Sequence, residues 1–435
     1  MEANEAISPI DGRYRKYTEP LAKFFSEFAF IKYRVLMESR YLELFLKTIG
    51  QKPKKIHLEV TDHDAEEIKK IEQTTNHDLK AIEYWMRSKL PKKLGNWIHF
   101  GLTSEDATNI AYGLMVTGAL KEVLIPSLEK ITKTLYDLRY TFRATPMLAR
   151  THGQPASPTT FGKEMAIFAA RLERQLEQIK AWRAPGKLAG ATGNYNALVA
   201  AYPKIDWQKF SKKFVESFKL EHTPLVTQIE SHDGYAELFD MLRRINTILI
   251  NFDQDIWRYV SDGWLKQRPV EGEVGSSTMP HKINPWLFEN SEGNLGLANA
   301  LFAHFSAKLP ISRLQRDLSD STVERSIGVA FGHALIGYEY LLKALERIDV
   351  NEPVLRQALS EHPEVLAEAI QTILRREGVA MPYEKLKELT RGKVLMREDL
   401  SRFIDELPVS AIIKQELRSL DAMSYVGLAE QLAKR

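Results

Sequence analysis

The eleven residues from Gly275 to Pro285 read Gly-Ser-Ser-Thr-Met-Pro-His-Lys-Ile-Asn-Pro and combine hydroxyl, cationic and amide side chains with two prolines. The prolines fix φ and remove backbone donors, while Gly272 and Gly275 add backbone freedom. Neither helical periodicity nor strand alternation fits the stretch. We therefore predict a polar loop over residues 266–286 that ends in a stiff anchor. A polar loop of this length is either disordered or functional.

Two further polar clusters stand beside helical patterns. Thr103-Ser104-Glu105-Asp106 places acids after an oxygen-bearing residue, which is also typical of a plain helix N-cap. Thr151-His152-Gly153-Gln154-Pro155 lies between two long helical patterns, where a histidine can equally be a structural residue. The loop itself can be a solvated connector. Taken together, these groups suit acid–base chemistry on an anionic substrate, and a serine nucleophile also stays open.

The composition excludes several classes of protein and site. The 60 basic residues nearly balance the 57 acidic ones, so no nucleic-acid partner is expected. Without cysteine there is no disulfide, no thiolate–metal site and no cysteine nucleophile. The eleven histidines are scattered and no His-Glu-x-x-His motif occurs, so we predict no metal site. The glycine-rich pieces match neither a P-loop nor a dinucleotide fingerprint, so we predict no cofactor.

The same composition indicates a soluble protein. Hydrophobic residues make up 44% of the chain and charged residues 27%, as in globular proteins with a sizeable core. The first residues lack the basic-then-apolar pattern of a signal peptide, and no stretch approaches ~18 uninterrupted apolar residues. We therefore expect a cytoplasmic protein without a membrane span.

Apolar side chains recur at helical intervals along most of the chain, with no alternating runs between them. Long patterns cover residues 17–49, 103–143, 158–183, 235–262, 286–308 and 320–348, and Pro126 is expected to bend the second of them. The predicted fold class is all-α, an elongated central five-helix bundle with smaller helical N- and C-terminal regions. We place the regions at residues 1–102, 103–350 (the bundle) and 351–435. Long helices with several apolar faces indicate an oligomer.

The Gly-Ser-Ser and Met-Pro-x-Lys-x-Asn-Pro pattern of the loop resembles the signature of the fumarase/aspartase superfamily. The clusters at 103–106 and 151–155 stand in the order of that superfamily's other two active-site segments. Within it, the chain resembles the adenylosuccinate lyase family of the longer bacterial type, over essentially its whole length. This resemblance rests on PIDGRY at 9–14, TTNHDLKAIEY at 74–84, RTHGQPASP at 150–158, RLQRDLSDSTVER at 313–325 and YEKLKELTRGK at 383–393.

The resemblance implies an assembly and a reaction. In the family, the five-helix bundles of four subunits pool into a homotetramer, and each active site takes one of its three segments from a different subunit. The implied reaction is a cofactor-free β-elimination that releases fumarate in purine nucleotide biosynthesis. Its two substrates are adenylosuccinate, which gives AMP, and the succinylo-carboxamide imidazole ribotide (SAICAR), which gives AICAR.

The resemblance also implies catalytic roles. Ser276 is the base that removes a proton next to a carboxylate, and Ser277 binds substrate beside it. A serine becomes such a base only if the loop closes, excludes water and places its oxygen near cations and N–H donors. His152 is the general acid for the departing nitrogen, since histidine exchanges protons near neutral pH. Lys282 and Asn284 meet the charge of the dianionic intermediate, an effect worth ~3–4 kcal/mol per donor in known oxyanion sites.

The remaining residues that the resemblance assigns position the substrate. His77, with Asn76 and Asp78, orients the substrate near its phosphate. Glu289, beside the anchor, supports either the lysine or the general acid. The implied binding set is Thr103, Ser104 and Gln228 for the succinyl carboxylates, Arg13, Tyr14, Ser321 and Arg325 for the phosphate, and Asn290, Arg316 and Thr322 in addition.

Two other functions compete with this interpretation. The first is another lyase of the superfamily, acting on argininosuccinate, aspartate or malate. The basic and hydroxyl positions at 13–14 and 321–325 favour a phosphorylated substrate and so argue against it. The second is an inactive helical scaffold, against which the intact Ser276, His152 and Lys282 argue.

Overall fold

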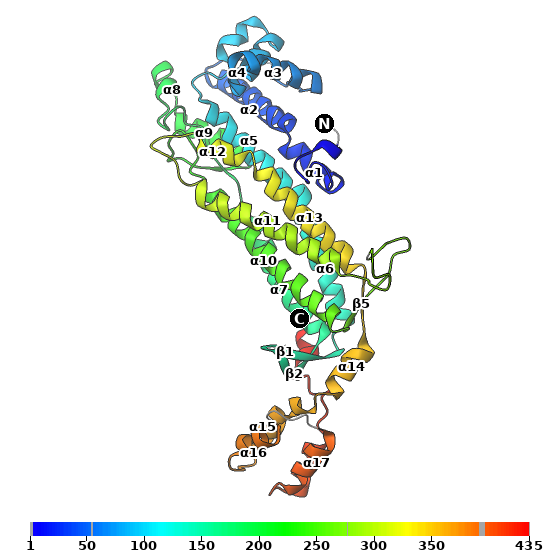
Figure 1. Ribbon diagram of the computed structural model, residues 1–435. Helices are drawn as coiled ribbons and strands as arrows, with labels where there is room; N and C mark the ends of the chain where they lie inside the picture. Colours follow the sequence, from blue (N-terminus) through cyan, green and yellow to red (C-terminus); the bar gives the residue numbers. More distant parts are fainter. Residues whose placement is uncertain (1–2, 54, 276, 391–395, 435) are drawn as a thin grey trace. The chain divides into compact units, whose positions relative to one another are not determined.

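The computed structural model describes residues 3–53, 55–275, 277–390 and 396–434 (Figure 1). Helices contain 64% of the residues and strands 5%, which confirms the predicted all-α class. The chain divides into two compact units. Unit 1 comprises Met1–Glu129, Arg174–Ile250 and Asn290–Tyr340, and unit 2 comprises Lys130–Glu173, Asn251–Glu289 and Leu341–Arg435. The three regions predicted from the sequence stay a prediction, since these units gather segments distant in the chain.

Five helices continue along the chain from one unit into the other, and they correspond to the predicted long helices. They are α6 (Ile125–Thr141), α7 (Phe161–Ala181), α10 (Asp233–Ser261), α11 (Trp286–Lys308) and α13 (Ile327–Leu345). The patterns at 235–262 and 286–308 therefore predicted their helices to within two residues.

Unit 1 holds the elements around which the candidate site is built. Its helices are η1 (Ala3–Glu5), α1 (Arg15–Phe25), α2 (Glu27–Thr48), α3 (Asp62–Thr75), α4 (Asp78–Lys89), η2 (Lys92–Trp97), α5 (Ser104–Ala119), the π-helical turn η3 (Leu120–Leu124), α8 (Asn196–Ala201), α9 (Trp207–Glu216) and α12 (Ser319–Glu324). Strands β3 (Pro185–Gly186) and β4 (Glu221–His222) pair in parallel. Helix α2 packs against α4 and α5, and α3 packs against α4 (Figure 1).

Unit 2 consists of two short antiparallel sheets and a series of short helices. Strand β1 (Pro146–Thr151) pairs with β2 (Gln154–Thr160), and β5 (Leu265–Gln267) pairs with β6 (Ile348–Val350). The helices are α14 (Glu352–Ser360), η4 (Pro363–Leu366), α15 (Ala367–Arg376), α16 (Pro382–Thr390), α17 (Arg397–Glu406), α18 (Ala411–Arg418) and α19 (Ala429–Leu432).

The hairpin β1–β2 lies between two of the predicted long helices, where the sequence analysis expected no strand. Thr151 pairs with Gln154, so the loop has two residues, His152 and Gly153. Their φ values are 54° and 76°, and two left-handed residues match the twist of a tight hairpin. The strands were missed because prolines interrupt their alternation, and α7 accordingly begins at Phe161 rather than at residue 158.

Three other predicted helices are divided or interrupted. The 17–49 pattern divides at Ser26, whose Oγ accepts a hydrogen bond from Ala29 N (3.1 Å) and caps α2. The bend expected at Pro126 is a π-helical turn, with Ile125 N donating to Leu120 O, because proline lacks the N–H that would continue the helix. The 320–348 pattern divides into α12 and α13.

The helical run Ser104–Thr141 has the length and apolar composition of a membrane span, but 67% of its apolar window is buried within the protein, as in a core helix.

The N-terminal part of this helical run is held by a buried ion pair. Asp106 and Lys187 are fully buried, with Lys187 Nζ 2.8 Å from Asp106 Oδ1. The same carboxylate accepts hydrogen bonds from the backbone N–H groups of Thr103, Ala189 and Gly190 (2.9, 2.9 and 3.1 Å). Asp106 therefore joins the start of α5 to residues 187–190.

We expect Asp106→Ala to lower the free energy of unfolding by about 3–5 kcal/mol, because it leaves the ammonium of Lys187 buried without its partner. Urea unfolding followed by circular dichroism measures the change. The matched control is Asp137→Ala on α6, which removes an exposed pair with Lys133 (2.7 Å) worth less than about 1 kcal/mol. Equal effects of the two substitutions would contradict the role given to Asp106.

Candidate active site

One cavity of unit 1, with a volume of about 500 Å³, gathers residues from five separate parts of the chain. It is lined by the junction of α3 and α4, the start of α5, residue 228, and the segment 316–325, with side chains of α2 behind them. Nine of the residues assigned by sequence lie here: Asn76, His77, Asp78, Thr103, Ser104, Gln228, Arg316, Ser321 and Arg325. The cavity is therefore the candidate substrate site.

His77 is held by the start of the helix that it caps. Asn76 ends α3 in a left-handed conformation (φ 49°), which asparagine tolerates, and the chain turns directly into α4. The Nδ1 atom of His77 accepts a hydrogen bond from Lys80 N (3.2 Å). Because Nδ1 is an acceptor, the neutral ring carries its proton on Nε2. His77 is half-exposed, so this Nε2–H is available to a ligand of the cavity.

Asp78 accepts hydrogen bonds from two arginines that line the cavity. Its Oδ2 lies 2.7 Å from Arg34 Nη1 and 3.4 Å from Arg325 Nη2. Partial burial would raise the pKa of Asp78, but the charge and hydrogen bond of Arg34 outweigh it and lower this pKa overall. Asp78 therefore stays ionised and holds both guanidinium groups, which makes it a positioning residue and not itself a donor to an anion.

Arg34 was not singled out by the sequence analysis, although it is the most buried cation of the cavity. It donates to Asp78 and to Thr108 Oγ1 (3.0 Å), and its guanidinium lies 3.7 Å from the centre of the Phe30 ring. Its Nε is buried and has no hydrogen-bond partner among the described residues. The available signal was an arginine at position 34 within the apolar pattern of residues 17–49.

The start of α5 presents unpaired donors to the cavity. Asp106 accepts the N–H of Thr103, which fixes the first turn of the helix. The Thr103 side chain forms a capping box with Asp106, so its hydroxyl accepts a backbone N–H and can still donate its own proton. The Ser104 hydroxyl makes no hydrogen bond with any described residue, and both residues line the cavity. A helix N-terminus favours negative charge because its N–H groups have no intrahelical acceptor. This part of the cavity is therefore suited to a carboxylate.

Arg316 lies between an amide and a buried acid. Its Nη1 donates to Gln228 Oε1 (3.1 Å), and its Nη2 is 3.2 Å from Glu105 Oε2. Burial and the nearby charge of Glu324 raise the pKa of Glu105 to about 8, although Arg316 opposes the shift. Gln228 is fixed in turn by its Nε2, which donates to Ala191 O (2.9 Å).

A second buried pair lies behind Glu105. His232 Nε2 is 3.0 Å from Glu324 Oε1, and both side chains are almost completely buried. Burial would lower the pKa of His232, but its hydrogen bond and charge interaction with Glu324, helped by Glu230 and Glu105, raise that pKa to about 9. No motif pointed to His232, and the family motif at 313–325 contains Glu324 without giving it a role, because only the fold brings residues 92 positions apart together.

Four other assigned residues of unit 1 do not line this cavity. Tyr14 OH accepts a hydrogen bond from Asn290 Nδ2 (3.3 Å), and the Tyr14 ring packs edge-on against Tyr340. Arg13 and Thr322 are exposed. The phosphate set predicted from the sequence is thus divided within one chain, with only Ser321 and Arg325 at the cavity.

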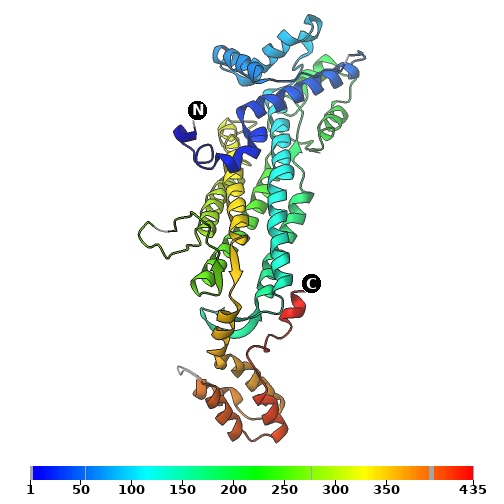
Figure 2. The same ribbon diagram turned by 90° about the vertical axis from the view of Figure 1, so that its right-hand side faces the viewer.

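The remaining assigned residues belong to unit 2, and Ser276 itself lies outside the described residues. His152 is exposed at the tip of the β1–β2 hairpin. Ser277 and Lys282 are exposed in the loop between β5 and α11, which spans residues 268–285 as the sequence predicted (Figure 2).

The side-chain amide of Asn284 holds the two ends of the segment from Gly275 to Pro285 together. Asn284 Nδ2 donates to Gly275 O (2.7 Å). A Cβ at Gly275 would collide with the backbone oxygen of Lys282, so only glycine fits this close approach. Glu289 accepts a hydrogen bond from Trp257 Nε1 (3.0 Å). Which residue Glu289 supports in the reaction therefore stays open.

Among the described residues, no group of three or more histidines and acids is arranged to hold a metal ion. The groups of the cavity that can bind a ligand are its cations, amides and hydroxyl groups. Three arginines, an imidazole N–H and a helix N-terminus favour a substrate with at least two anionic groups.

Comparisons with known proteins identify the family of the chain. A lyase family matches residues 26–299, and the family description "Adenylosuccinate lyase C-terminal" matches residues 312–426. Adenylosuccinate lyases of Haemophilus influenzae and Vibrio cholerae are 47% and 48% identical to this chain, over 99% of it and 98% and 99% of their own lengths. A relative of the same name from Dictyostelium discoideum is 47% identical over 97% of this chain and 96% of its own length.

The chain belongs to the adenylosuccinate lyase family. Solved structures agree with the fold of that family. A fumarate lyase from Mesorhizobium sp. BNC1 superposes with a TM-score of 0.77 at 18% identity, covering 96% of each chain. A 3-carboxy-cis,cis-muconate lactonizing enzyme from Pseudomonas putida gives 0.74 at 20% identity, covering 97% of each chain. At such identities, these structures support the fold alone.

In this member of the family, the buried His232–Glu324 pair should make stability depend on pH. The pKa of His232 is about 9 when folded and near 6.5 when unfolded, so its contribution is complete below pH 6.5 and is lost as the pH rises toward 9. We expect the loss to be on the order of 3 kcal/mol. Thermal unfolding between pH 6.5 and 9 measures it, and His232→Gln should flatten the slope.

His333→Gln is the matched control. His333 is also buried, with Nδ1 3.0 Å from Asn294 Oδ1, but burial lowers its pKa below the ordinary value. Its titration therefore falls below pH 6.5, and the slope above that pH should be the same as in wild type. A slope that His232→Gln leaves unchanged would show that this pair does not cause the pH dependence.

Proposed function

We propose that this chain is a carbon–nitrogen lyase that releases fumarate from adenylosuccinate, giving AMP, and from SAICAR, giving AICAR. The observation that carries the proposal is 47–48% identity, over 99% of the chain, to relatives named adenylosuccinate lyase. The polyanion-binding character of the cavity in unit 1 supports it, because both substrates carry a phosphate and two carboxylates. The absence of cysteine is in keeping with a cytoplasmic location, which is part of the proposal.

The reaction requires a base, an acid and stabilisation of negative charge. Ser276 removes the proton from the carbon beside a carboxylate, the carbon–nitrogen bond breaks, and His152 protonates the departing nitrogen. Lys282 and Asn284 stabilise the dianionic intermediate between these steps. The exposed anchor between Pro280 and Pro285 is a suitable carrier for that lysine, since its backbone is restrained at both ends.

The cavity binds the parts of the substrate that do not react. The hydroxyl groups of Thr103 and Ser104 and the start of α5 receive a succinyl carboxylate, with Gln228 and Arg316 beside them. Arg325 and Ser321 receive the phosphate at the other side, together with Arg13 and Tyr14. His77 donates its Nε2–H to the bound substrate, and Asn76, Asn290 and Thr322 complete the binding set.

We also propose that complete sites form in a homotetramer. His152 and Lys282 are exposed, the His152 imidazole and the Lys282 ammonium make no hydrogen bond or ion pair with a described residue, and neither residue lines the cavity. Other copies of the chain can therefore bring these residues to a cavity. Glu289 then supports either Lys282 or His152 in the assembled site.

The test of the function is turnover of adenylosuccinate, followed by the absorbance change on fumarate release. Turnover of argininosuccinate, aspartate or malate instead would favour another lyase, and no turnover at all would favour the inactive scaffold.

The same adenylosuccinate assay tests the proposed contact between Arg325 and the phosphate of the substrate. Arg325→Ala should raise KM by about 10- to 150-fold, because it removes a charge-assisted hydrogen bond.

Succinyladenosine, which lacks the phosphate, separates this role from a structural one. Arg325 is half-exposed and pairs with Asp78 and Glu27, so its loss can also disturb the cavity wall. Wild type should cleave succinyladenosine poorly, and Arg325→Ala should cause little further loss. Equal damage to both substrates would make Arg325 structural. The control is Arg376→Ala, which removes an exposed pair with Glu416 and should change neither KM.

Shared sites predict complementation between inactive variants. His152→Ala and Ser276→Ala proteins should each be inactive, and mixing them with subunit exchange should restore activity. Random mixing should give roughly a quarter of wild-type activity, because each of the two chains that supply a site is intact at the needed residue half of the time. Zero activity in verified mixed tetramers would contradict shared sites. Ser277→Ala mixed with Ser276→Ala is the control, since both changes lie in the same segment.

A further inference from the structure

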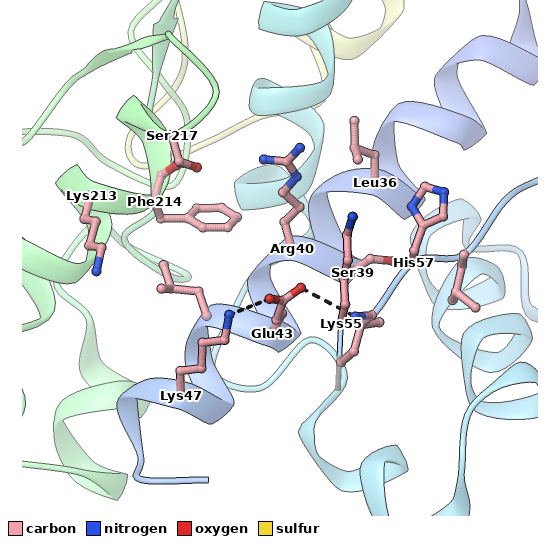
Figure 3. Close-up of a pocket in the computed structure, with 13 residues that line it drawn as sticks. Leu36, Ser39, Arg40, Glu43, Lys47, Lys55, His57, Lys213, Phe214 and Ser217 are labelled. Carbon is pink, nitrogen blue, oxygen red and sulfur yellow. Dashed lines mark hydrogen bonds and ion pairs between the residues drawn. The ribbon is translucent and has the colours of Figure 1, made fainter. Parts of the chain in front are cut away.

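A second cavity of unit 1 shares no lining residue with the candidate active site. Its volume is about 460 Å³, and it is bounded by α2, the segment 55–58 and the end of α9. Figure 3 shows Arg40 and Glu43 of α2 between Lys213 and Phe214 of α9 on one side and His57 on the other. Cavities of this size bind small organic molecules.

The described residues that line this cavity are mainly cationic. Four of them carry a positive charge and only Glu43 carries a negative one. Glu43 is already satisfied, because Lys47 Nζ lies 2.5 Å away and Ile56 N donates to its other oxygen (3.4 Å). The charged groups of Arg40, Lys55 and Lys213 make no hydrogen bond or ion pair with a described residue. The cavity therefore has an excess of positive charge that its own acid does not neutralise.

Ser39 gives an independent indication of a ligand. The residue is 3% exposed, it lines the cavity, and its Oγ has no hydrogen-bond partner among the described residues. A buried hydroxyl without a partner destabilises a folded protein, so most such groups are satisfied by protein, water or ligand. A ligand with a polar atom at the wall formed by α2 would satisfy this hydroxyl.

The opposite wall is apolar and rigid. Phe214 is 1% exposed and packs against Tyr41, Phe210 and Phe218, so its ring cannot easily move. Ile56 is also buried beside the cavity. Leu36, Leu44 and Leu58 also line the cavity and are only partly buried. A purely ionic ligand would leave these apolar side chains in contact with water, whereas a ligand with a flat apolar group would cover them.

The geometry points to a binding site for a small phosphorylated molecule with an aromatic group, of about the size of a nucleoside monophosphate. The phosphate binds among Arg40, Lys55 and Lys213, whose charged groups make no hydrogen bond or ion pair with a described residue; the Arg40 guanidinium lies 5.5 Å from the centre of the Phe218 ring. The Ser39 hydroxyl bonds to a polar atom of the ligand, and the aromatic group packs on the wall that contains Phe214. The site is separate from the proposed catalytic cavity and does not depend on the proposed reaction.

Isothermal titration calorimetry of the full-length protein with AMP tests the site. Wild type should bind AMP at two sites per chain, one in each cavity. Arg40→Glu/Lys213→Glu should weaken one of them by at least about tenfold, because it removes charge-assisted contacts to the phosphate. Arg325→Ala should weaken only the other site, so failure of one proposal is distinguishable from failure of the other. Adenosine and inorganic phosphate should each bind the second site more weakly than AMP does.

Two further variants separate a specific site from general surface charge. Lys212→Glu changes a neighbouring lysine of α9 that pairs with Glu216 and does not line the cavity, so it should leave both sites intact. Ser39→Ala should weaken AMP binding several-fold without lowering the melting temperature, since the lost hydroxyl has no partner in the chain. The proposal is wrong if Arg40→Glu/Lys213→Glu retains both sites, if Lys212→Glu weakens binding equally, or if inorganic phosphate binds as tightly as AMP.

Discussion

The buried carboxylate of Asp106 is the interaction on which the candidate site depends. It accepts one ammonium and three backbone N–H groups, and it thereby fixes the first turn of α5 against residues 187–190. Asn109 strengthens the same junction, because its amide exchanges hydrogen bonds with the backbone of Lys187 in both directions. A buried charge is costly unless fully paired, so this junction has essentially one favourable geometry. As a consequence, Thr103 and Ser104 line the cavity at the start of this helix.

The cations of the cavity follow the same physical rule. Arg34 is oriented by Asp78, and Arg316 is oriented by Glu105, each through a carboxylate that is wholly or largely removed from water. Pairing reduces the mobility of each guanidinium and leaves further N–H groups for a ligand. Behind Glu105, the acids Glu324 and Glu230 are balanced by His232, which explains why this histidine binds its proton so strongly. The cavity is thus positive at its surface and supported by acids beneath it.

The proposed reacting groups lie on turns and loops, whereas several of the proposed binding groups, such as His77, Thr103 and Ser104, lie at helix starts. His152 occupies a left-handed position of a two-residue hairpin loop, and Lys282 lies two residues after Pro280 in the anchor. Rigid elements on either side hold these loops in place, the paired strands β1 and β2 in one case and β5 with α11 in the other. Such an arrangement leaves His152 and Lys282 exposed within one chain, which the proposed assembly of several chains requires.

The sequence by itself determined the all-α class, the long helices at 235–262 and 286–308, the polar loop and the family, because helical periodicity and motif spacing are local properties. It also predicted that residues 76–78, 103–104 and 316–325 belong to one site, through the family motif. Only the tertiary structure decided that Arg34 joins them, that His232 meets Glu324, and that Asp106 pairs with Lys187. These contacts join residues 44 to 92 positions apart, and no local pattern encodes such a distance. The β1–β2 hairpin was likewise decided by cross-strand hydrogen bonds, since its proline-containing strands lack the alternation that sequence reasoning requires.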